Sequence, residues 1–322
     1  MKETVLLFAC FLLFACTKNN IVENQPSVVP PVVQDSIPTT KYNLAFLSYC
    51  DQFSKTAEVK PFGTRGNGEL SGIAASQTNK DILYVHDDGN INTVYLTNKN
   101  GSDLGKLIID NLSNSDVEDI TVGPGPEDGK NYIYLADIGN NNLKATSATI
   151  YRFKEPIITT ADKNTVVHIT AYDKIKISYA SGSANAETLM IDPLSKDIYV
   201  LTKQNNKSYL YQATYPQVLN AIIPLKAQAI LNFDLLTAGD ISADGSEILL
   251  RNVGQIWYWK RASGESILQT LLKQPQDAPY AINEKQGEGI CFSYNSDGYI
   301  TDTEIMGYTA AVSNISFYKR VK

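Results

Sequence analysis

The sequence is poor in the residues that most often bind soft metals, and it has no concentration of positive charge. There are 2 histidines and 4 cysteines among 322 residues, and 28 lysines and arginines stand against 34 acidic residues. The scarcity of histidine and cysteine argues against a zinc site, and the lack of a basic cluster argues against nucleic acid as a partner. His168 lies in a strand-like segment and is expected to be structural, so any catalytic histidine must be His86.

Long apolar runs are also scarce, and the longest lies at residues 5–15. It follows Lys2 and is shorter than the ~20 residues needed to span a bilayer, which is typical of a secretory signal. Residues 13–16, Leu-Phe-Ala-Cys, then resemble a lipobox. We therefore expect residues 1–16 to be a lipoprotein signal peptide and Cys16 to be lipidated, which would attach the chain to a membrane. The alternative is an ordinary signal peptide with an incidental cysteine.

The next segment, residues 17–41, is rich in proline and polar residues and has no hydrophobic periodicity. This composition is typical of a flexible tether. No acidic cluster follows Cys16, so we expect a lipid-anchored protein of the outer membrane that faces the periplasm. Residues 42–322 are left for one folded domain. It holds Cys50 and Cys291, which are expected to be two buried free thiols, although export would also permit a disulfide.

A pattern of about fifty residues recurs five times in this domain, and repeats of this length are typical of propellers and solenoids. Each copy has a polar residue just before an aliphatic one, a turn, an apolar strand that ends in a polar residue, and a strand with an aromatic residue. The opening segments are residues 69–73, 117–120, 186–189, 239–241 and 287–290. The second strands are residues 82–85, 132–135, 198–201, 247–250 and 299–301. Short strands separated by turn residues indicate an all-β fold.

These repeats predict a β-propeller of five four-stranded blades. The last copy has room for only three strands, whereas residues 44–48 and 58–62 precede the first copy and have no blade of their own. We expect an N-terminal strand from this region to join the last blade and close the ring. The alternatives are a β-sandwich with coincidental repeats, or six blades with a degenerate copy in residues 156–186 or 212–238.

The polar residues of the first two strands are expected to converge on one face of the ring. They stand at the start of strand one and at the end of strand two, and these positions share an edge of an antiparallel hairpin. The first strands contribute Ser71, Glu118, Glu187, Glu288 and, in the fourth copy, Gly239 and Asp240. The second strands contribute Asp87, Asp137, Thr202, Asn252 and Asp302, flanked by His86, Asp88, Lys203, Arg251 and Glu304.

Glutamates crowded on an axis repel one another unless they are protonated, paired or bridged by a cation. Ca²⁺ is the expected cofactor, because it takes oxygen ligands in irregular geometry. The expected calcium ligands are Ser71, Glu118, Glu187, Asp240 and Glu288. The expected catalytic acids and bases are Asp87, Asp137, Asp302 and His86. The expected binding residues for an anionic substrate are Lys203, Arg251 and Asn252. Alternatively, the three aspartates only bond neighbouring loops.

Several segments resemble a group of exported bacterial propeller proteins of unsettled function, some of which are labelled phytase- or esterase-like. The matching segments are Glu-Leu-Ser-Gly-Ile at 69–73, Val-Glu-Asp-Ile at 117–120, Ala-Asp-Ile-Gly-Asn at 136–140, Ile-Tyr-Arg-Phe at 150–153 and Gln-Gly-Glu-Gly-Ile at 286–290. The resemblance covers nearly all of the domain and implies a propeller, but it implies no particular reaction.

The repeats also resemble calcium-activated nucleotidases, or apyrases, which are five-bladed propellers with one Ca²⁺ on the axis. That resemblance implies that Ser71 of the Glu-Leu-Ser segment, Glu118, Glu187, and Glu288 of the Glu-Gly-Ile segment hold the ion. The family has a serine in the fourth blade where this chain offers a Gly-Asp pair at 239–240, so that ligand stays open. The family's further catalytic segments are not found in this sequence. Gluconolactonase-like propellers likewise hold a divalent ion on the axis, which can activate water or polarise a carbonyl.

Two functions are expected from this sequence. The first is a metal-dependent hydrolase that acts on an ester or a phosphoester. The second is a non-enzymatic module with a structural axial metal, which binds a glycan, a peptide or an envelope protein. The lack of an obvious nucleophile motif favours the second.

Overall fold

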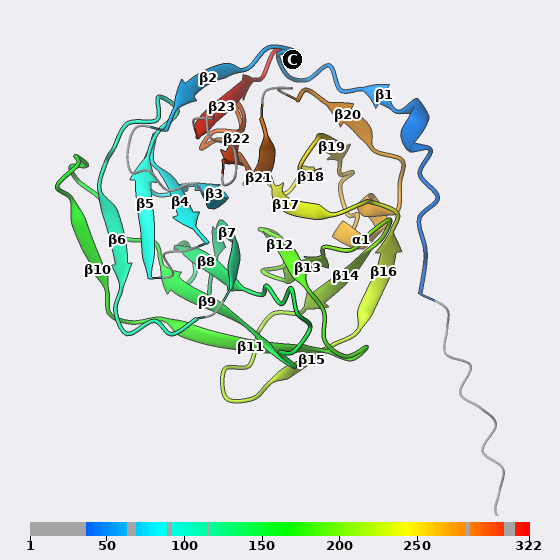
Figure 1. Cartoon of the computed structure of the whole chain (residues 1–322), viewed down its shortest axis with the longest axis horizontal. Helices are drawn as coiled ribbons and strands as arrows, with labels where there is room; N and C mark the ends of the chain where they lie inside the picture. The colour runs from blue at the N-terminus through cyan, green and yellow to red at the C-terminus, as the bar shows by residue number, and fades with distance from the viewer. Residues whose placement is uncertain (1–36, 63–68, 89–91, 115, 281–283, 306–312) are drawn as a thin grey trace, which may run out of the picture. The chain divides into compact units, whose positions relative to one another are not determined.

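Short strands rich in Ile, Val, Leu and Tyr alternate with turns along the chain, and in the computed structural model they form five sheets. The structure describes residues 37–62, 69–88, 92–114, 116–280, 284–305 and 313–322. The first strands of the five sheets contact one another in ring order, and the sheets radiate from them (Figure 1). The described chain is therefore a five-bladed β-propeller, which confirms the predicted fold class.

Each blade has four antiparallel strands, which are named in order from the axis outward. Blade 1 consists of β3 (Leu70–Ala75), β4 (Leu83–Asp87), β5 (Thr93–Thr97) and β6 (Lys106–Ile109). Blade 2 consists of β7 (Val117–Pro124), β8 (Asn131–Asp137), β9 (Ala148–Lys154) and β11 (Asp173–Tyr179). Blade 3 consists of β12 (Ala186–Ile191), β13 (Ile198–Thr202), β14 (Ser208–Ala213) and β16 (Ala227–Leu231). Blade 4 consists of β17 (Leu236–Ile241), β18 (Glu247–Asn252), β19 (Gln255–Lys260) and β20 (Gln276–Ala278). Blade 5 consists of β21 (Gln286–Phe292), β22 (Gly298–Glu304), β23 (Asn314–Lys319) and β2 (Glu58–Pro61).

Blade 5 shows how the ring closes. Its outermost strand, β2, comes from the N-terminal part of the chain and pairs with β23 in antiparallel register, so that Val59 faces Ser316. This confirms the predicted closure by an N-terminal strand. A closed ring leaves no exposed inner edge that another chain could extend.

The two regions that might have hidden a sixth blade instead add outer strands to existing blades. After β9, the strand β10 (Val166–Ile169) crosses to blade 1 and runs parallel to β6. After β14, the strand β15 (Ile223–Leu225) crosses to blade 2 and runs parallel to β11. The strands β10 and β11, which are consecutive in the chain, therefore belong to different blades.

The N-terminal segment of the described chain runs along the outer edges of three blades (Figure 1). Residues 37–41, which the sequence analysis assigned to the tether, bond β16 of blade 3, because Ile230 N donates to Pro38 O and Thr40 N donates to Ile230 O, both at 2.9 Å. The short strand β1 (Ser48–Tyr49), which follows the 3₁₀ turn Leu44–Phe46, runs parallel to β20 of blade 4. Phe53 then enters the seam between blades 4 and 5, where its ring meets Tyr258 and Tyr299 edge-on.

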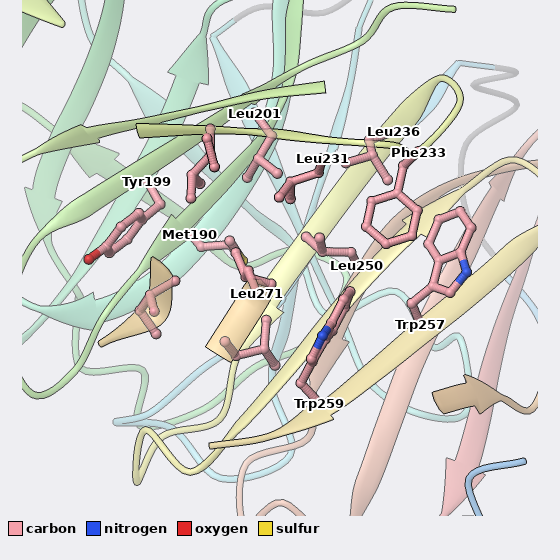
Figure 2. Close-up of a cluster of buried hydrophobic side chains, with 14 of the residues drawn as sticks. Met190, Tyr199, Leu201, Leu231, Phe233, Leu236, Leu250, Trp257, Trp259 and Leu271 are labelled. Carbon is pink, nitrogen blue, oxygen red and sulfur yellow. The ribbon is translucent and has the colours of Figure 1, made fainter. Parts of the chain in front are cut away.

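Large apolar side chains fill the seams between blades. Leu201 of β13 and Leu250 of β18 belong to one buried cluster between blades 3 and 4, together with Trp257 (Figure 2). The short helix α1 (Ile267–Leu271), which begins with a capping box at Ser266, adds both of its terminal residues to this cluster. A tyrosine recurs in the second strand of four blades, and all four are buried: Tyr84, Tyr134, Tyr199 and Tyr299.

Cys50 and Cys291 are buried free thiols, as expected. Cys291 lies in β21, whereas Cys50 follows β1 on the outside of blade 4. Among the described residues, no helix is long and apolar enough to cross a membrane.

Two phenylalanines of the N-terminal segment test whether this segment is part of the folded ring. Phe53 is 2% exposed and Phe46 is 82% exposed. We expect Phe53→Ala to lower the free energy of unfolding by about 3–5 kcal/mol, because it empties a packed aromatic site. The matched control Phe46→Ala is expected to change it by less than about 0.5 kcal/mol. Guanidinium denaturation measures both free energies of unfolding. An effect of Phe53→Ala as small as that of Phe46→Ala would show that the segment does not stabilise the ring.

Candidate functional site

All five inner strands carry a β-bulge near their first residues. In blade 1, Leu70 faces Asp87 and Gly72 faces His86, so Ser71 is the extra residue. A register shift at the same place occurs in the other four hairpins. The residues at the five bulges are Ser71, Glu118, Glu187, Thr237 and Glu288. A bulge re-aims a side chain out of the normal alternation of a strand. We call these five residues the bulge ring, and the end of the axis where they lie the mouth.

The bulge ring corrects the sequence alignment in the fourth blade. The bulge there falls at Thr237, and Asp240 lies three residues further along β17. The Asp240 carboxylate accepts a hydrogen bond from Phe292 N of blade 5 at 2.7 Å, and its other oxygen lies 3.4 Å from the Thr121 hydroxyl of blade 2. Asp240 therefore crosses the axis below the mouth, away from the other expected calcium ligands. The shared Leu-Ser and Leu-Thr pairs at 70–71 and 236–237 could have revealed the register.

The two hydroxyl residues of the bulge ring hold the neighbouring glutamates in place. Ser71 Oγ donates to the backbone oxygen of Glu118 at 2.9 Å. Thr237 Oγ1 lies 3.0 Å from the backbone oxygen of Glu288 and 3.1 Å from that of Gly287. Each hydroxyl oxygen can still accept or coordinate through its lone pairs. These hydroxyls therefore couple blade 1 to blade 2 and blade 4 to blade 5 at the mouth.

The carboxylates of the three ring glutamates differ in their hydrogen-bond and ion-pair partners. Glu187 has both oxygens occupied: Asn185 Nδ2 donates to Oε1 at 3.2 Å, and Lys203 Nζ forms an ion pair with Oε2. Glu118 is 7% exposed, and in the described part of the chain no donor or cation lies within bonding distance of its carboxylate. Glu288 is 5% exposed and lies near Lys203 and the Gln286 amide.

Gly139 explains how the Glu118 carboxylate fits. A Cβ atom at position 139 would lie 2.2 Å from Glu118 Oε1 and 2.5 Å from Asp116 Oδ2. Both carboxylates thus lie against the bare backbone of this glycine, and a side chain there would displace them. The glycine of the Ala-Asp-Ile-Gly-Asn segment at 136–140 therefore makes room for these two carboxylates at the mouth.

Burial raises the pKa of all three ring glutamates. Burial raises the pKa of Glu118 far above its usual range, and Glu187, Asp116 and Asp88 raise it further. Burial also raises the pKa of Glu187 and of Glu288, although Lys203 acts in the opposite direction on both. All three glutamates lie within electrostatic reach of the Lys203 ammonium. Of the three glutamates, Glu187 contacts the lysine directly, whereas Glu118 and Glu288 act on it only through their charge, and the described residues contain no group of three or more acidic, His or Cys side chains that could hold a metal ion.

Burial and neighbouring carboxylates raise the pKa of two carboxyl groups at the rim of the mouth. Burial raises the pKa of Asp88 to about 6, and Asp116, Glu69, Asp87 and Glu288 contribute by repulsion. Burial and the charge of Glu288 raise the pKa of Glu304 to about 7. In the sequence, both residues are recognisable only as neighbours of the expected site residues. Carboxyl groups with such values can exchange protons at neutral pH.

His86 and Asp302 lie in seams between blades. The His86 ring packs over Gly72, and its two nitrogens are buried without a hydrogen-bond partner in the described chain. Burial lowers the pKa of His86 to about 3, so the ring is neutral at physiological pH. Asp302 is 0% exposed; its Oδ1 accepts a hydrogen bond from Gly289 N at 2.6 Å, and burial raises its pKa to about 7. The structure closes both side chains off from a ligand at the mouth.

Arg251 is likewise enclosed. Its guanidinium is 0% exposed, forms an ion pair with Glu284 at 2.9 Å and donates to Gly289 O at 3.0 Å. The buried guanidinium of Arg251 therefore joins blade 4 to blade 5. Of the two cationic residues that were expected to bind an anionic substrate, Arg251 is enclosed and Lys203 faces the mouth.

Asp87, Asp137 and Asn252 occupy equivalent positions, each facing the residue before a bulge. Asp137 Oδ1 accepts a hydrogen bond from Asp116 N at 2.9 Å, and Asn252 Nδ2 donates to Asp234 O at 2.9 Å. The two side chains therefore fasten the loops that lead into their own inner strands. In blade 5 this position is Thr303, since Thr303 faces Gly287; Asp302 is one residue out of the predicted register.

Neither a known protein family nor a curated protein matches the sequence. Among solved structures, a gluconolactonase from Xanthomonas campestris is similar, with a TM-score of 0.48 and 9% identity over 88% of this chain and 95% of that chain. The Dos1 propeller has a TM-score of 0.35 and 11% identity over 78% of this chain and 68% of that chain. Similarity this distant carries no argument about activity, so any function has to be inferred from the chain's own residues.

The buried Glu118 carboxylate predicts how stability depends on pH without metal. Because folding raises its pKa, Glu118 contributes stability below the unfolded value of about 4.5, and this contribution is lost as the pH rises. We expect the free energy of unfolding in a chelator to fall from pH 5 to pH 8, and to fall less steeply in Glu118→Gln, by up to about 1.4 kcal/mol per pH unit. Urea denaturation measures this slope. The buried control Glu155→Gln is expected to keep the wild-type slope, and an unchanged slope in Glu118→Gln would contradict the assignment.

Proposed function

We propose that this propeller is a calcium-dependent hydrolase whose metal binds at the bulge ring. The observation that carries the proposal is the Glu118 carboxylate, which is almost fully buried and has no donor or cation in the described chain. A buried charge without a partner is expensive, and sites of this kind are usually completed by a cation, a proton or ordered water. The charge of Glu187 acts on Glu118, and the charge of Glu288 acts on Glu187, although the described side chains of the metal-free chain form no group of three or more that could already hold a metal ion.

The chemistry of the donor set favours Ca²⁺. Carboxylate and hydroxyl oxygens are hard ligands, and Ca²⁺ accepts irregular arrangements of them. Full ionisation leaves the three glutamates and Lys203 with two negative charges in excess, which one divalent cation would neutralise. The resemblance to calcium-activated nucleotidases also gains support, because Thr237 provides a hydroxyl in the fourth blade where that family has a serine.

In this proposal, Glu118 and Glu288 hold the metal through their carboxylates, and the hydroxyls of Ser71 and Thr237 keep the two glutamates in position. A bound Ca²⁺ would polarise the substrate's carbonyl or phosphoryl oxygen. Glu304 and Asp88 at the rim would accept the proton of the attacking water, in place of the enclosed His86 and Asp302. The negative rim, with Arg251 enclosed, favours an uncharged ester over a phosphoester.

Calcium titration of the chelator-stripped protein by calorimetry tests the metal site. We expect binding by the wild type, and at least tenfold weaker binding by Glu118→Gln and by Glu288→Gln, because each loses a charged ligand. Glu155→Gln removes a buried carboxylate elsewhere and is expected to bind as the wild type does. Hydrolysis of nitrophenyl esters and phosphates, with and without chelator, tests the reaction. Absence of binding at millimolar calcium would refute the proposal.

A second candidate is a non-enzymatic module that binds a glycan, a peptide or an envelope protein around a structural metal. The enclosure of His86 and Asp302 favours it, because two of the expected catalytic groups do not reach the mouth. Glu288→Gln distinguishes the candidates. Lost turnover supports the hydrolase, whereas a lower melting temperature with unchanged ligand binding supports the module.

We also propose that the chain is anchored in the cell envelope through a lipidated Cys16, as the sequence analysis predicts. Residues 1–36 lie outside the described structure, so the proposal rests on the lipobox alone. Cys16→Ser is expected to move the protein from the membrane fraction to the soluble fraction of its host. Retention of this variant in the membrane fraction would contradict the anchor.

A further inference from the structure

Lys203 lies beside Glu187 of the bulge ring. It directly follows β13, and its backbone N–H donates to Asn185 O at 3.1 Å, which fixes the start of its side chain beside Glu187. Its ammonium forms an ion pair with Glu187 Oε2 and lies within electrostatic reach of Glu118 and Glu288. Lys203 is thus the cation that all three ring glutamates share.

We infer that Lys203 is the resident counter-ion of the bulge ring, and that it releases Glu187 when a divalent cation binds. The inference rests on the proposed function and adds how the site is regulated. Two positive centres in one group of carboxylates repel each other, and this repulsion weakens as they separate. The ammonium sits on a flexible four-carbon stem, and its side chain is 24% exposed, so it can withdraw toward solvent.

The contacts of Glu187 fit such an exchange. Asn185 holds Oε1 at 3.2 Å, while Lys203 occupies Oε2. When the lysine leaves, Asn185 still orients the carboxylate, and Oε2 becomes free for the metal. Glu118, which has no partner to lose in the described chain, needs no such rearrangement.

The exchange has a consequence for selectivity. A monovalent cation in place of the ammonium would leave the net charge of the ring unchanged, so this exchange would release little free energy. A divalent cation brings one charge more and is therefore favoured over Na⁺ and K⁺. Lys203 would thus keep the metal-free ring folded and also make it selective for divalent ions.

Substitution of Lys203 tests the inference through calcium affinity. We expect Lys203→Met to bind Ca²⁺ at least tenfold more tightly than the wild type, because the competing charge is gone. Lys203→Arg keeps the charge and is expected to stay within about threefold of the wild type. Lys207→Met, in the same loop, is expected to leave the affinity unchanged. Calorimetric titration in a buffer of low ionic strength measures all four proteins.

The outcomes separate this inference from the proposed function. If the wild type binds Ca²⁺ and Lys203→Met binds it no more tightly, the inference is overturned and the proposed metal site stands. If Lys203→Met alone binds Ca²⁺, the inference stands and the proposed function of the native chain fails. If neither binds, both fail.

A second measurement uses the wild-type protein and does not depend on the folding of a variant. Lysines are acylated briefly with an amine-reactive reagent, with and without Ca²⁺, and each site is quantified by mass spectrometry. We expect Ca²⁺ to increase the labelling of Lys203 at least threefold while Lys207 stays constant. Unchanged or reduced labelling of Lys203 at saturating Ca²⁺ would overturn the inference.

Discussion

A buried carboxylate needs a positive partner, a donor or a proton, and the mouth of this propeller gathers several carboxylates around too few partners. Glu187 is met by Lys203 and Asn185, whereas Glu118 lies over Gly139 with no donor in the described chain. The blades fix these positions rigidly, because the ring glutamates come from inner strands that are hydrogen-bonded to their own blades and packed against the next. The protein cannot relieve the repulsion by moving one glutamate away, so the deficit of positive charge is built into the fold.

The polar residues near the axis serve two separate purposes. At the mouth, the bulges aim side chains along the axis. One step below, polar groups fasten neighbouring blades: Asp119 accepts a hydrogen bond from Leu189 N at 2.8 Å, Asp240 from Phe292 N at 2.7 Å, and Arg251 donates to Gly289 O at 3.0 Å. These groups lie within a few residues of the mouth in sequence, yet they are closed off from any ligand. Chemistry at the mouth and cohesion of the ring therefore depend on different side chains.

The sequence predicted the architecture well because architecture depends on repetition. Five copies of one hairpin pattern, and a spare strand ahead of the first copy, were enough to predict the blades and the closure through β2. It could not predict that residues 166–169 and 223–225 would extend the preceding blades, because a short apolar strand does not indicate which sheet it joins.

The misplacement of Asp240 and Asp302 has one physical cause. Side chains alternate between the two faces of a strand, and a single extra residue reverses that alternation. Because the repeats were aligned without these bulges, Asp240 was matched with the ring although Thr237 occupies the position, and Asp302 was matched one residue away from its true equivalent. The repeats do align Glu118, Glu187 and Glu288 with one another, because each stands at a bulge.

The most direct test of this account is a crystal structure of the chain from residue 37 onward, grown with Tb³⁺ and measured at an anomalous wavelength. The account predicts one strong peak at the mouth, bonded to the carboxylates of Glu118 and Glu288, with the Lys203 ammonium withdrawn from Glu187. An empty ring, with Glu118 hydrogen-bonded as a neutral acid and Lys203 still on Glu187, would contradict it.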